Sequence, residues 1–171
     1  MKNFLFIFIG LIFGSHLLAQ DNQKINSAIF PDIALKAPNP PKPIKGWELA
    51  ENWKATDGIA LSEDLKNASV LVGKYPGKII KFQFKGNAVG IETVAIPDAG
   101  IIEYSIDGSD WQMKDLFYPL NTEKHIPLYF TLGKNLKNRR HTLQIRLTDE
   151  RNSESSGNKC VISHFYFNAP E

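Results

Sequence analysis

The chain has 171 residues, of which 43% are hydrophobic and 22% charged, so it is long enough for one domain and not of the composition of a disordered chain. With 20 Lys and Arg against 18 Asp and Glu, its net charge is +2, which does not indicate nucleic acid or an anionic membrane surface as a partner. The single cysteine, Cys160, excludes an intramolecular disulfide framework.

Residues 1–19 have the pattern of a secretory signal peptide. Lys2 supplies the positive start, an apolar run extends from Phe4 to Phe13, and the small residue Ala19 precedes the expected cut at Gln20. A membrane anchor is the alternative, but the apolar core is short and no basic stop-transfer cluster follows it. We therefore expect export to the periplasm or out of the cell, without stable membrane insertion after cleavage.

A proline-rich arm or linker is predicted over residues 20–45. Its prolines are Pro31, Pro38, Pro40, Pro41 and Pro43. Because proline fixes φ and has no N–H to donate, the stretch from Ala37 to Pro43 should be extended. A ligand for a proline-binding domain is possible in principle, but the composition favours a plain spacer. The composition changes at Gly46, where we place the start of a domain that covers residues 46–168.

Short segments with alternating apolar and polar residues follow within this domain. The clearest are 78–85, 101–106 and 142–147, each with one apolar and one polar face, as in half-buried strands. Gly86-Asn87 is predicted to be a turn before a strand over 88–94, and Asp107-Gly108 to be the turn of a hairpin.

Residues 128–132 also alternate, and residues 160–168 are apolar on both faces, which predicts a central strand. Ser62 to Ala68 can form one short helix, capped by Ser62 and with Leu65 as its buried contact. About seven short strands separated by turns indicate an all-β fold, an antiparallel β-sandwich of the jelly-roll or galactose-binding-like kind.

The sequence has no motif that would place a serine as a catalytic nucleophile. It has no G-x-S-x-G motif, and Ser109 lies in a segment predicted to be a turn. His125, His141 and His164 are too far apart in the sequence for a local metal-binding pair, and His164, within the last predicted strand, is expected to be a hydrogen-bonded structural residue. Cys160 lies in a predicted strand and should be a buried thiol. We therefore predict no catalytic residue, no metal ligand and no cofactor.

Binding of a sugar is more plausible, because exposed aromatic rings stack on the apolar faces of pyranoses. Trp111 is the best candidate, since it follows a tight turn and is flanked by Asp110 and Gln112, although tryptophan in a small sandwich is usually part of the core. The predicted ligand-binding residues are Trp111, Asp110, Gln112, Asp98, Tyr129 and Arg146. Further candidates are the aromatic residues Trp47, Trp53, Tyr75 and Tyr118, and Arg139-Arg140, for which a solvated surface is the default interpretation.

A series of motifs in the domain resembles one known family. The motifs are Leu71-Val72-Gly73-Lys74-Tyr75-Pro76-Gly77, Phe82-Gln83-Phe84-Lys85-Gly86-Asn87, Pro97-Asp98-Ala99-Gly100, Glu103-Tyr104-Ser105-Ile106-Asp107-Gly108, His125-Ile126-Pro127-Leu128-Tyr129, His141-Thr142-Leu143 and Ile162-Ser163-His164-Phe165. In the order of its motifs and in their residues, the series resembles the β-sandwich module that accompanies catalytic domains in bacterial SGNH/GDSL-type esterases. Many of these esterases act on carbohydrate esters.

The catalytic blocks of that family, Gly-Asp-Ser and a late Asp-x-x-His, are missing here, so no catalytic residue is carried over. The resemblance implies a free-standing accessory module that binds a glycan or docks on a carbohydrate-active enzyme. Two alternatives stay open. One is an SGNH/GDSL-related hydrolase acting on carbohydrate esters, with a site assembled across loops. The other is a purely structural docking module.

Export can be tested directly. If residues 1–19 are a signal peptide, protein purified from its host should begin at Gln20 or within a few residues of it. N-terminal sequencing measures this, and recovery of intact chains starting at Met1 from a membrane pellet would contradict the prediction.

Overall fold

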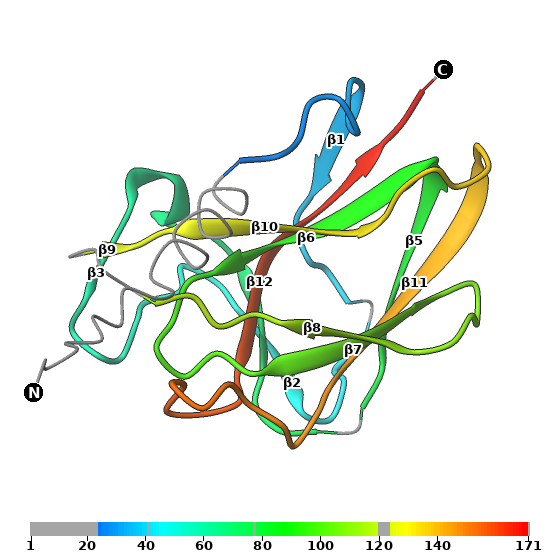
Figure 1. Cartoon of the computed structure of the whole chain (residues 1–171). Helices are drawn as coiled ribbons and strands as arrows, with labels where there is room; N and C mark the ends of the chain where they lie inside the picture. Colours follow the sequence, from blue (N-terminus) through cyan, green and yellow to red (C-terminus); the bar gives the residue numbers. More distant parts are fainter. Residues whose placement is uncertain (1–23, 41, 77, 120–123, 171) are drawn as a thin grey trace, which may run out of the picture.

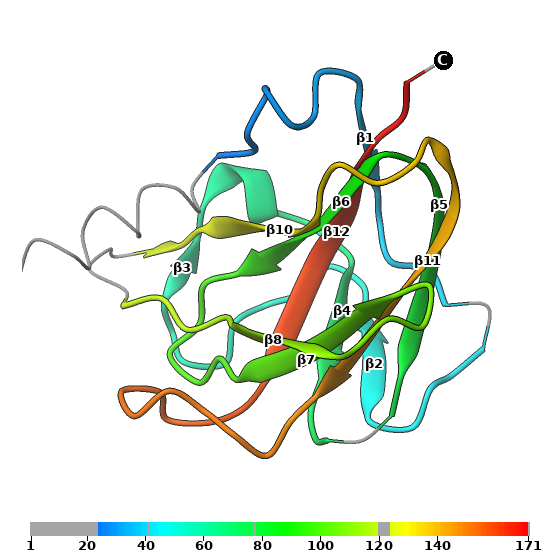
Figure 2. The ribbon, with the colours of Figure 1, turned by 45° about the vertical axis from the view of Figure 1, so that its right-hand side comes forward.

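A computed structural model describes residues 24–170, except 41, 77 and 120–123, so the predicted signal peptide lies outside the described residues. Two antiparallel sheets pack against each other (Figures 1 and 2). Within the described part of the chain, no helix is long and apolar enough to cross a bilayer. The predicted all-β, antiparallel sandwich is confirmed.

The larger sheet has six strands in the order β10-β6-β12-β4-β2, with β1 also paired to β12. Its strands are β1 (Ile33–Lys36), β2 (Trp47–Ala50), β4 (Val70–Gly73), β6 (Ala88–Val94), β10 (Pro127–Gly133) and β12 (Cys160–Asn168). The smaller sheet has the order β5-β11-β7-β8. Its strands are β5 (Ile80–Gly86), β7 (Ile101–Ile106), β8 (Gln112–Asp115) and β11 (Arg139–Leu147). A short parallel pair is formed by β3 (Ala60–Leu61) and β9 (Lys124–His125).

The strands predicted from alternation are present with the expected faces. In β5 every second residue is buried, beginning with Ile80, and the residues between are exposed. From His141 onward β11 also has every second residue buried, and the residues between are half-buried. β12 is central, because it pairs with β6 on one side and with β4 and β1 on the other. The predicted short helix is a single 3-10 turn, η1 (Glu63–Leu65), in which Leu65 is fully buried. Ser62 occupies the cap position, but its side chain makes no capping hydrogen bond.

The predicted hairpin around Asp107-Gly108 is formed by β7 and β8. Asp107 and Gly108 both have positive φ, 55° and 78°, and the Ser109 amide donates to the Ile106 carbonyl over 3.0 Å. Positive φ at both central residues is the turn that matches the twist of antiparallel strands. Ser109 is therefore a turn residue, as predicted.

Gly86 and Asn87 carry the chain from one sheet to the other. β5 ends at Gly86 in the four-stranded sheet, and β6 begins at Ala88 in the six-stranded sheet. A Cβ atom at Gly86 would lie 1.8 Å from the carbonyl oxygen of Asn168, so a side chain cannot be accommodated there. The connection is thus a crossover between sheets, and β5 and β6 do not pair.

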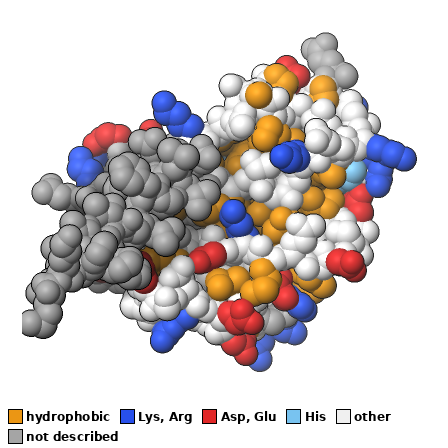
Figure 3. All heavy atoms as spheres, in the orientation of Figure 1, with side chains coloured by type: hydrophobic (Ala, Val, Ile, Leu, Met, Phe, Trp, Pro, Cys, Tyr) orange, Lys and Arg blue, Asp and Glu red, His pale blue; other side chains and the backbone are white. Residues whose placement is uncertain are grey.

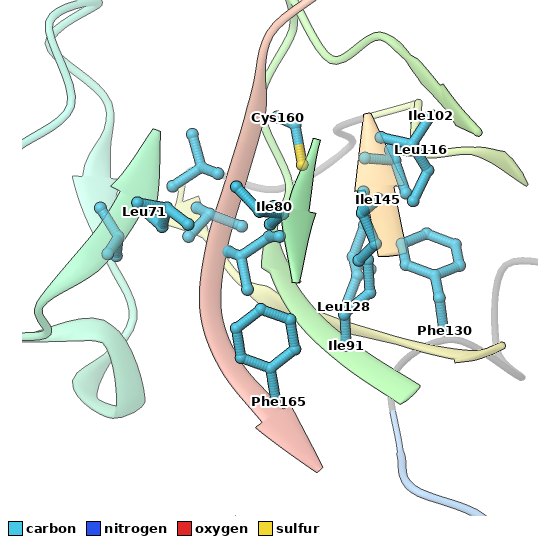
Figure 4. Close-up of a cluster of buried hydrophobic side chains, with 14 of the residues drawn as sticks. Leu71, Ile80, Ile91, Ile102, Leu116, Leu128, Phe130, Ile145, Cys160 and Phe165 are labelled. Atoms are coloured by element: carbon cyan, nitrogen blue, oxygen red, sulfur yellow. The ribbon is translucent and has the colours of Figure 1, made fainter. Parts of the chain in front are cut away.

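The core lies between the two sheets, where apolar side chains from both interlock (Figure 4). Ile91 and Ile162 of the larger sheet and Ile102 and Ile145 of the smaller one are fully buried. The Cys160 thiol also belongs to this core, and burial raises its pKa far above the ordinary value of 9.0. The prediction of a buried structural thiol is confirmed.

The proline-rich segment contributes to the sandwich. Residues 33–36 form β1, which pairs with the end of β12 from Ile33 opposite Asn168 to Lys36 opposite Phe165. Upstream of β1, Phe30 is buried and its ring packs edge-on against Tyr166 at 4.9 Å between centroids. This part of the chain therefore covers the outer face of the larger sheet near β12.

The two faces of β11 should respond differently to mutation. Ile145→Ala should lower the free energy of unfolding by about 2–5 kcal/mol, because it removes fully buried methyl groups. Gln144→Ala on the outer face should change it by about 0.5 kcal/mol or less. Urea denaturation of both variants measures the difference, and equal losses would mean that both faces of β11 are buried.

Candidate functional site

Trp111 lies directly before β8, on the outer face of the four-stranded sheet. Met113 pairs with Glu103 on that face, and Trp111 shares it because it is two residues away. The guanidinium carbon of Arg146 lies 4.3 Å from the centre of the Trp111 ring, and its Nε donates to Glu103 over 2.7 Å. Two of the predicted site residues, Trp111 and Arg146, are therefore in contact.

The residues that flank Trp111 do not share its surface. Gln112 pairs with Tyr104, which belongs to the core, and its side-chain oxygen accepts a hydrogen bond from the Tyr104 hydroxyl over 2.9 Å. Gln112 thus lies on the opposite face of β8, since neighbouring residues of a strand alternate. Asp110 is exposed in the turn. The expected grouping of Asp110, Trp111 and Gln112 around one ligand is not what the strand geometry produces.

Tyr129 and Asp98 lie elsewhere in the molecule. Tyr129 is in β10 of the six-stranded sheet and packs edge-on against Tyr166, with 6.1 Å between ring centroids. Burial, followed by the carboxylates of Glu92 and Asp64, raises the pKa of Tyr129 to about 12. Asp98 follows β6 and forms an ion pair of 2.6 Å with Lys159. Of the predicted set, the structure therefore brings only Trp111 and Arg146 into contact.

Asp98 stands on the rim of a hollow of about 680 Å³, which we call the Trp53 hollow. Its floor includes Val72 of β4 and Val161 of β12, which are paired neighbours on the outer face of the six-stranded sheet. The other lining residues are Glu48, Ala50, Trp53, Lys54, Ala55, Thr56, Asp57, Lys74, Ile96, Pro97, Ser156 and Lys159. An apolar floor with a polar rim is the usual build of a small-molecule site.

Four charged side chains on the rim form two ion pairs. Asp98 contacts Lys159, and Glu48 contacts Lys74. Each pair keeps charge on the rim balanced and offers both donors and acceptors to a ligand. Trp53 was among the aromatic candidates in the sequence. The residues that line the hollow with it come from five separate segments, so sequence spacing could not predict that they lie together.

Local contacts hold Trp53 in the wall of the hollow. The Trp53 amide donates to the Ala68 carbonyl over 3.0 Å, and its ring packs edge-on against the His125 ring at 6.2 Å. Asp57 accepts from the Ile59 amide, which closes a tight turn, and lies 3.0 Å from Nε2 of His125. The loop that carries Trp53 is therefore held at one end by Ala68, just before β4, and at the other by His125 of β9.

His125 and His141 are bound between acceptors. His125 is fully buried, with Nδ1 2.6 Å from the Ala95 carbonyl and Nε2 on Asp57. His141 lies in the same way between Asp107, at 2.8 Å, and the Lys137 carbonyl, at 2.7 Å. A ring with both nitrogens committed to oxygens has no free nitrogen to act as a base, so both contacts are structural.

Ser163, Glu92 and His164 lie together but not as a hydrolytic triad. Ser163 is fully buried and donates to Glu92 over 2.7 Å, while His164 Nδ1 lies 3.3 Å from the same carboxylate oxygen. In a triad the histidine stands between serine and acid, whereas here the acid stands between the other two. Among the described residues, no group of three or more His, Cys, Asp or Glu is arranged to hold a metal ion.

No protein-family model matches the chain, and no curated protein matches it in sequence. Two crystal structures of a two-domain esterase active on acetylated mannans are similar in fold, with TM-scores of 0.58 and 0.57. The first of them was co-crystallized with mannopentaose. Identity is 12% in both cases, over 86% of this chain and 39% of that chain. A family two carbohydrate esterase from Cellvibrio japonicus matches with a TM-score of 0.46 and 12% identity, over 81% of this chain and 36% of that chain.

This chain therefore spans about two fifths of the length of the mannan esterase chains that it matches. At this level of identity the similarity shows a shared fold. It does not carry residue roles or an activity from those esterases to this chain.

The carboxylate of Asp107 offers a pH test of the structural role of His141. Burial alone would raise the pKa of Asp107. This pKa is nevertheless held below its ordinary value of 3.8 by hydrogen bonds from the Thr142 amide and His141, and by the charges of His141 and Arg139. A carboxylate whose pKa is lowered in the folded protein stabilises the fold when the pH is above its ordinary pKa. This stabilisation is lost as the pH falls through the lowered pKa.

Asp107→Asn should therefore lower the free energy of unfolding at neutral pH by about 1–2 kcal/mol, and the deficit should shrink below pH 3.8. Asparagine tolerates the positive φ at this position, so the backbone is preserved. Denaturation curves across the acid range measure the effect, with Asp110→Asn in the same turn as the control. A deficit that does not change with pH would contradict the assignment.

Proposed function

We propose that the protein is an exported, non-catalytic β-sandwich module that binds carbohydrate. The observation that carries this proposal is the Trp53 hollow, where a tryptophan stands over an apolar floor of Val72 and Val161 inside a rim of paired charges. A pyranose has an apolar C–H face and hydroxyl groups at its edge. The hollow offers a partner for each: the indole and the floor for the face, and the rim for the hydroxyls.

The family resemblance in the sequence supports a role beside a carbohydrate esterase of the SGNH/GDSL type. The fold likeness to a two-domain esterase active on acetylated mannans agrees with this, since the matched region is a minor part of that chain. We therefore propose that this module either brings a carbohydrate-active enzyme to its glycan or docks on such an enzyme. Acetylated or plain mannan oligosaccharides are the first ligands to test.

The hydrolase alternative has less support. His125 and His141 have both ring nitrogens bound to oxygens, and Ser163 is buried. The structural docking alternative would need an extended apolar surface, whereas the exposed large hydrophobic side chains of the described residues are divided among β1, β2, the β4–β5 connection and β8. Trp111 remains a proposed ligand residue, with Arg146 rather than Gln112 beside it.

Titration with mannopentaose distinguishes the two tryptophans. Trp53→Ala should weaken binding about tenfold, because stacking on one aromatic face contributes about 1–2 kcal/mol. Trp111→Ala should leave the affinity unchanged if the Trp53 hollow is the site. Isothermal titration calorimetry measures both, and circular dichroism checks that the variants fold.

Because Trp53 also packs on the core, a rim variant provides a second measurement. Lys159→Gln removes the charge beside Asp98 from an exposed position and should weaken binding without loss of stability. Binding that depends on Trp111 and not on Trp53 or Lys159 would move the site to the four-stranded sheet. No binding to any glycan in a neutral and acidic panel would refute carbohydrate binding and leave only docking on a carbohydrate-active enzyme.

A further inference from the structure

The outer face of β5 and β11 carries a regular array of basic and amide side chains. On β5 the exposed residues are Lys81, Gln83 and Lys85. On β11 the register sets Arg140 opposite Lys85, Thr142 opposite Gln83 and Gln144 opposite Lys81. Residues directly opposite in an antiparallel pair lie on the same face. The array therefore runs from the basic pair Lys85 and Arg140, through the neutral pair Gln83 and Thr142, to Lys81 and Gln144.

The carboxylates near this array are engaged by other residues. Asp107 binds Arg139, His141 and the Thr142 amide, and Glu103 binds Arg146. Within the described residues, no ion pair joins Lys81, Lys85 or Arg140 to a carboxylate. The positive charge of the face is thus local, because the whole chain carries a net charge of only +2.

The placement of Lys85 directly opposite Arg140 on the neighbouring strand does not stabilise the sheet. Like charges directly opposite each other on adjacent strands are destabilising, and β-sheets usually avoid them. The same two residues, with Gln83 and Thr142, border a hollow of about 480 Å³ at the end of the sandwich, and its other lining residues are Phe84, His141 and Phe167. Figure 3 shows basic side chains gathered where β11 begins, at the right of the view. An exposed pair of like charges that costs stability, set beside a hollow, points to an anionic ligand.

We propose that this face binds a carboxylate-bearing polysaccharide, such as one containing uronic acids; this rests on the proposed function as a carbohydrate-binding module. Lys85 and Arg140 hold a carboxylate between them, and Gln83, Thr142 and Gln144 receive the neutral hydroxyls of the chain. Lys81 and Lys85 are four residues apart, or about 13–14 Å along a strand, so successive acidic groups separated by more than one sugar ring reach both.

Amide and hydroxyl groups between the charges favour a polysaccharide over a nucleic acid. A nucleic-acid backbone carries a charge at every residue and is held by closely spaced cations, with aromatic side chains for its bases. Here neutral side chains occupy the positions between the basic ones. Trp111, on the same face of the sheet but two strands away, adds an apolar surface beyond the array.

Titration with tetragalacturonate tests the proposal, with its fully methyl-esterified form as the neutral counterpart. The acid should bind at least about tenfold more tightly than the ester, and binding should weaken as salt is added. Lys85→Gln together with Arg140→Gln should weaken binding of the acid about tenfold, the size expected for two exposed charge contacts. Lys42→Gln together with Lys45→Gln, in the loop before β2, removes the same charge and should leave binding unchanged.

Three results would overturn the proposal: no binding of tetragalacturonate, equal binding of acid and ester, or equal losses in the two double variants. Binding of an oligothymidylate as tight as that of tetragalacturonate would also overturn it, since the face would then be a general polyanion surface. Mannopentaose, titrated in parallel, separates the two proposals. If it binds through Trp53 while tetragalacturonate does not bind, this face has been misassigned and the proposed function stands; if neither binds, both fail.

Discussion

Every strand of the sandwich must send alternate side chains into the core, and this constraint decides what remains for the two outer faces. On the four-stranded sheet, β11 turns Leu143 and Ile145 inward, which leaves Thr142 and Gln144 outside. On the six-stranded sheet, the outward residues include the apolar Val72 and Val161, and a loop tied down by Trp53 stands over them. The outer face is therefore polar and open where β5 and β11 pair, while the six-stranded sheet has an apolar stretch under the loop that carries Trp53.

Alternation made much of the fold predictable from the sequence. The inward and outward residues of β5, β10 and β11, the β7–β8 hairpin and the central place of β12 all follow from local pattern and turn chemistry. The crossover at Gly86 does not, because the choice of sheet for β6 depends on its pairing with β12, more than seventy residues later, and on the space beside Asn168.

The candidate sites were less predictable, because they depend on pairings between distant segments. Contact of Trp111 with Arg146 requires β8, β7 and β11 in register, and the rim pair of Asp98 and Lys159 joins two loops. The placement of Gln112 and Trp111 on opposite faces could have been predicted from the sequence, because adjacent residues of a strand point to opposite faces. A candidate site on a strand is therefore better sought two residues away, or across the ladder, than among adjacent residues.

The chemistry of these surfaces favours a binding role in which several weak contacts act together. One indole face, or a few exposed charges, contributes little affinity alone, because exposed ion pairs are screened and sugars stay hydrated. The Trp53 hollow and the basic array lie on different sheets of the same sandwich. A second contact made by the same ligand network then becomes an intramolecular event with a high effective concentration. If both faces bind as proposed, a glycan network in which neutral and acidic chains are linked would be held by both faces, whereas either chain alone would be released quickly.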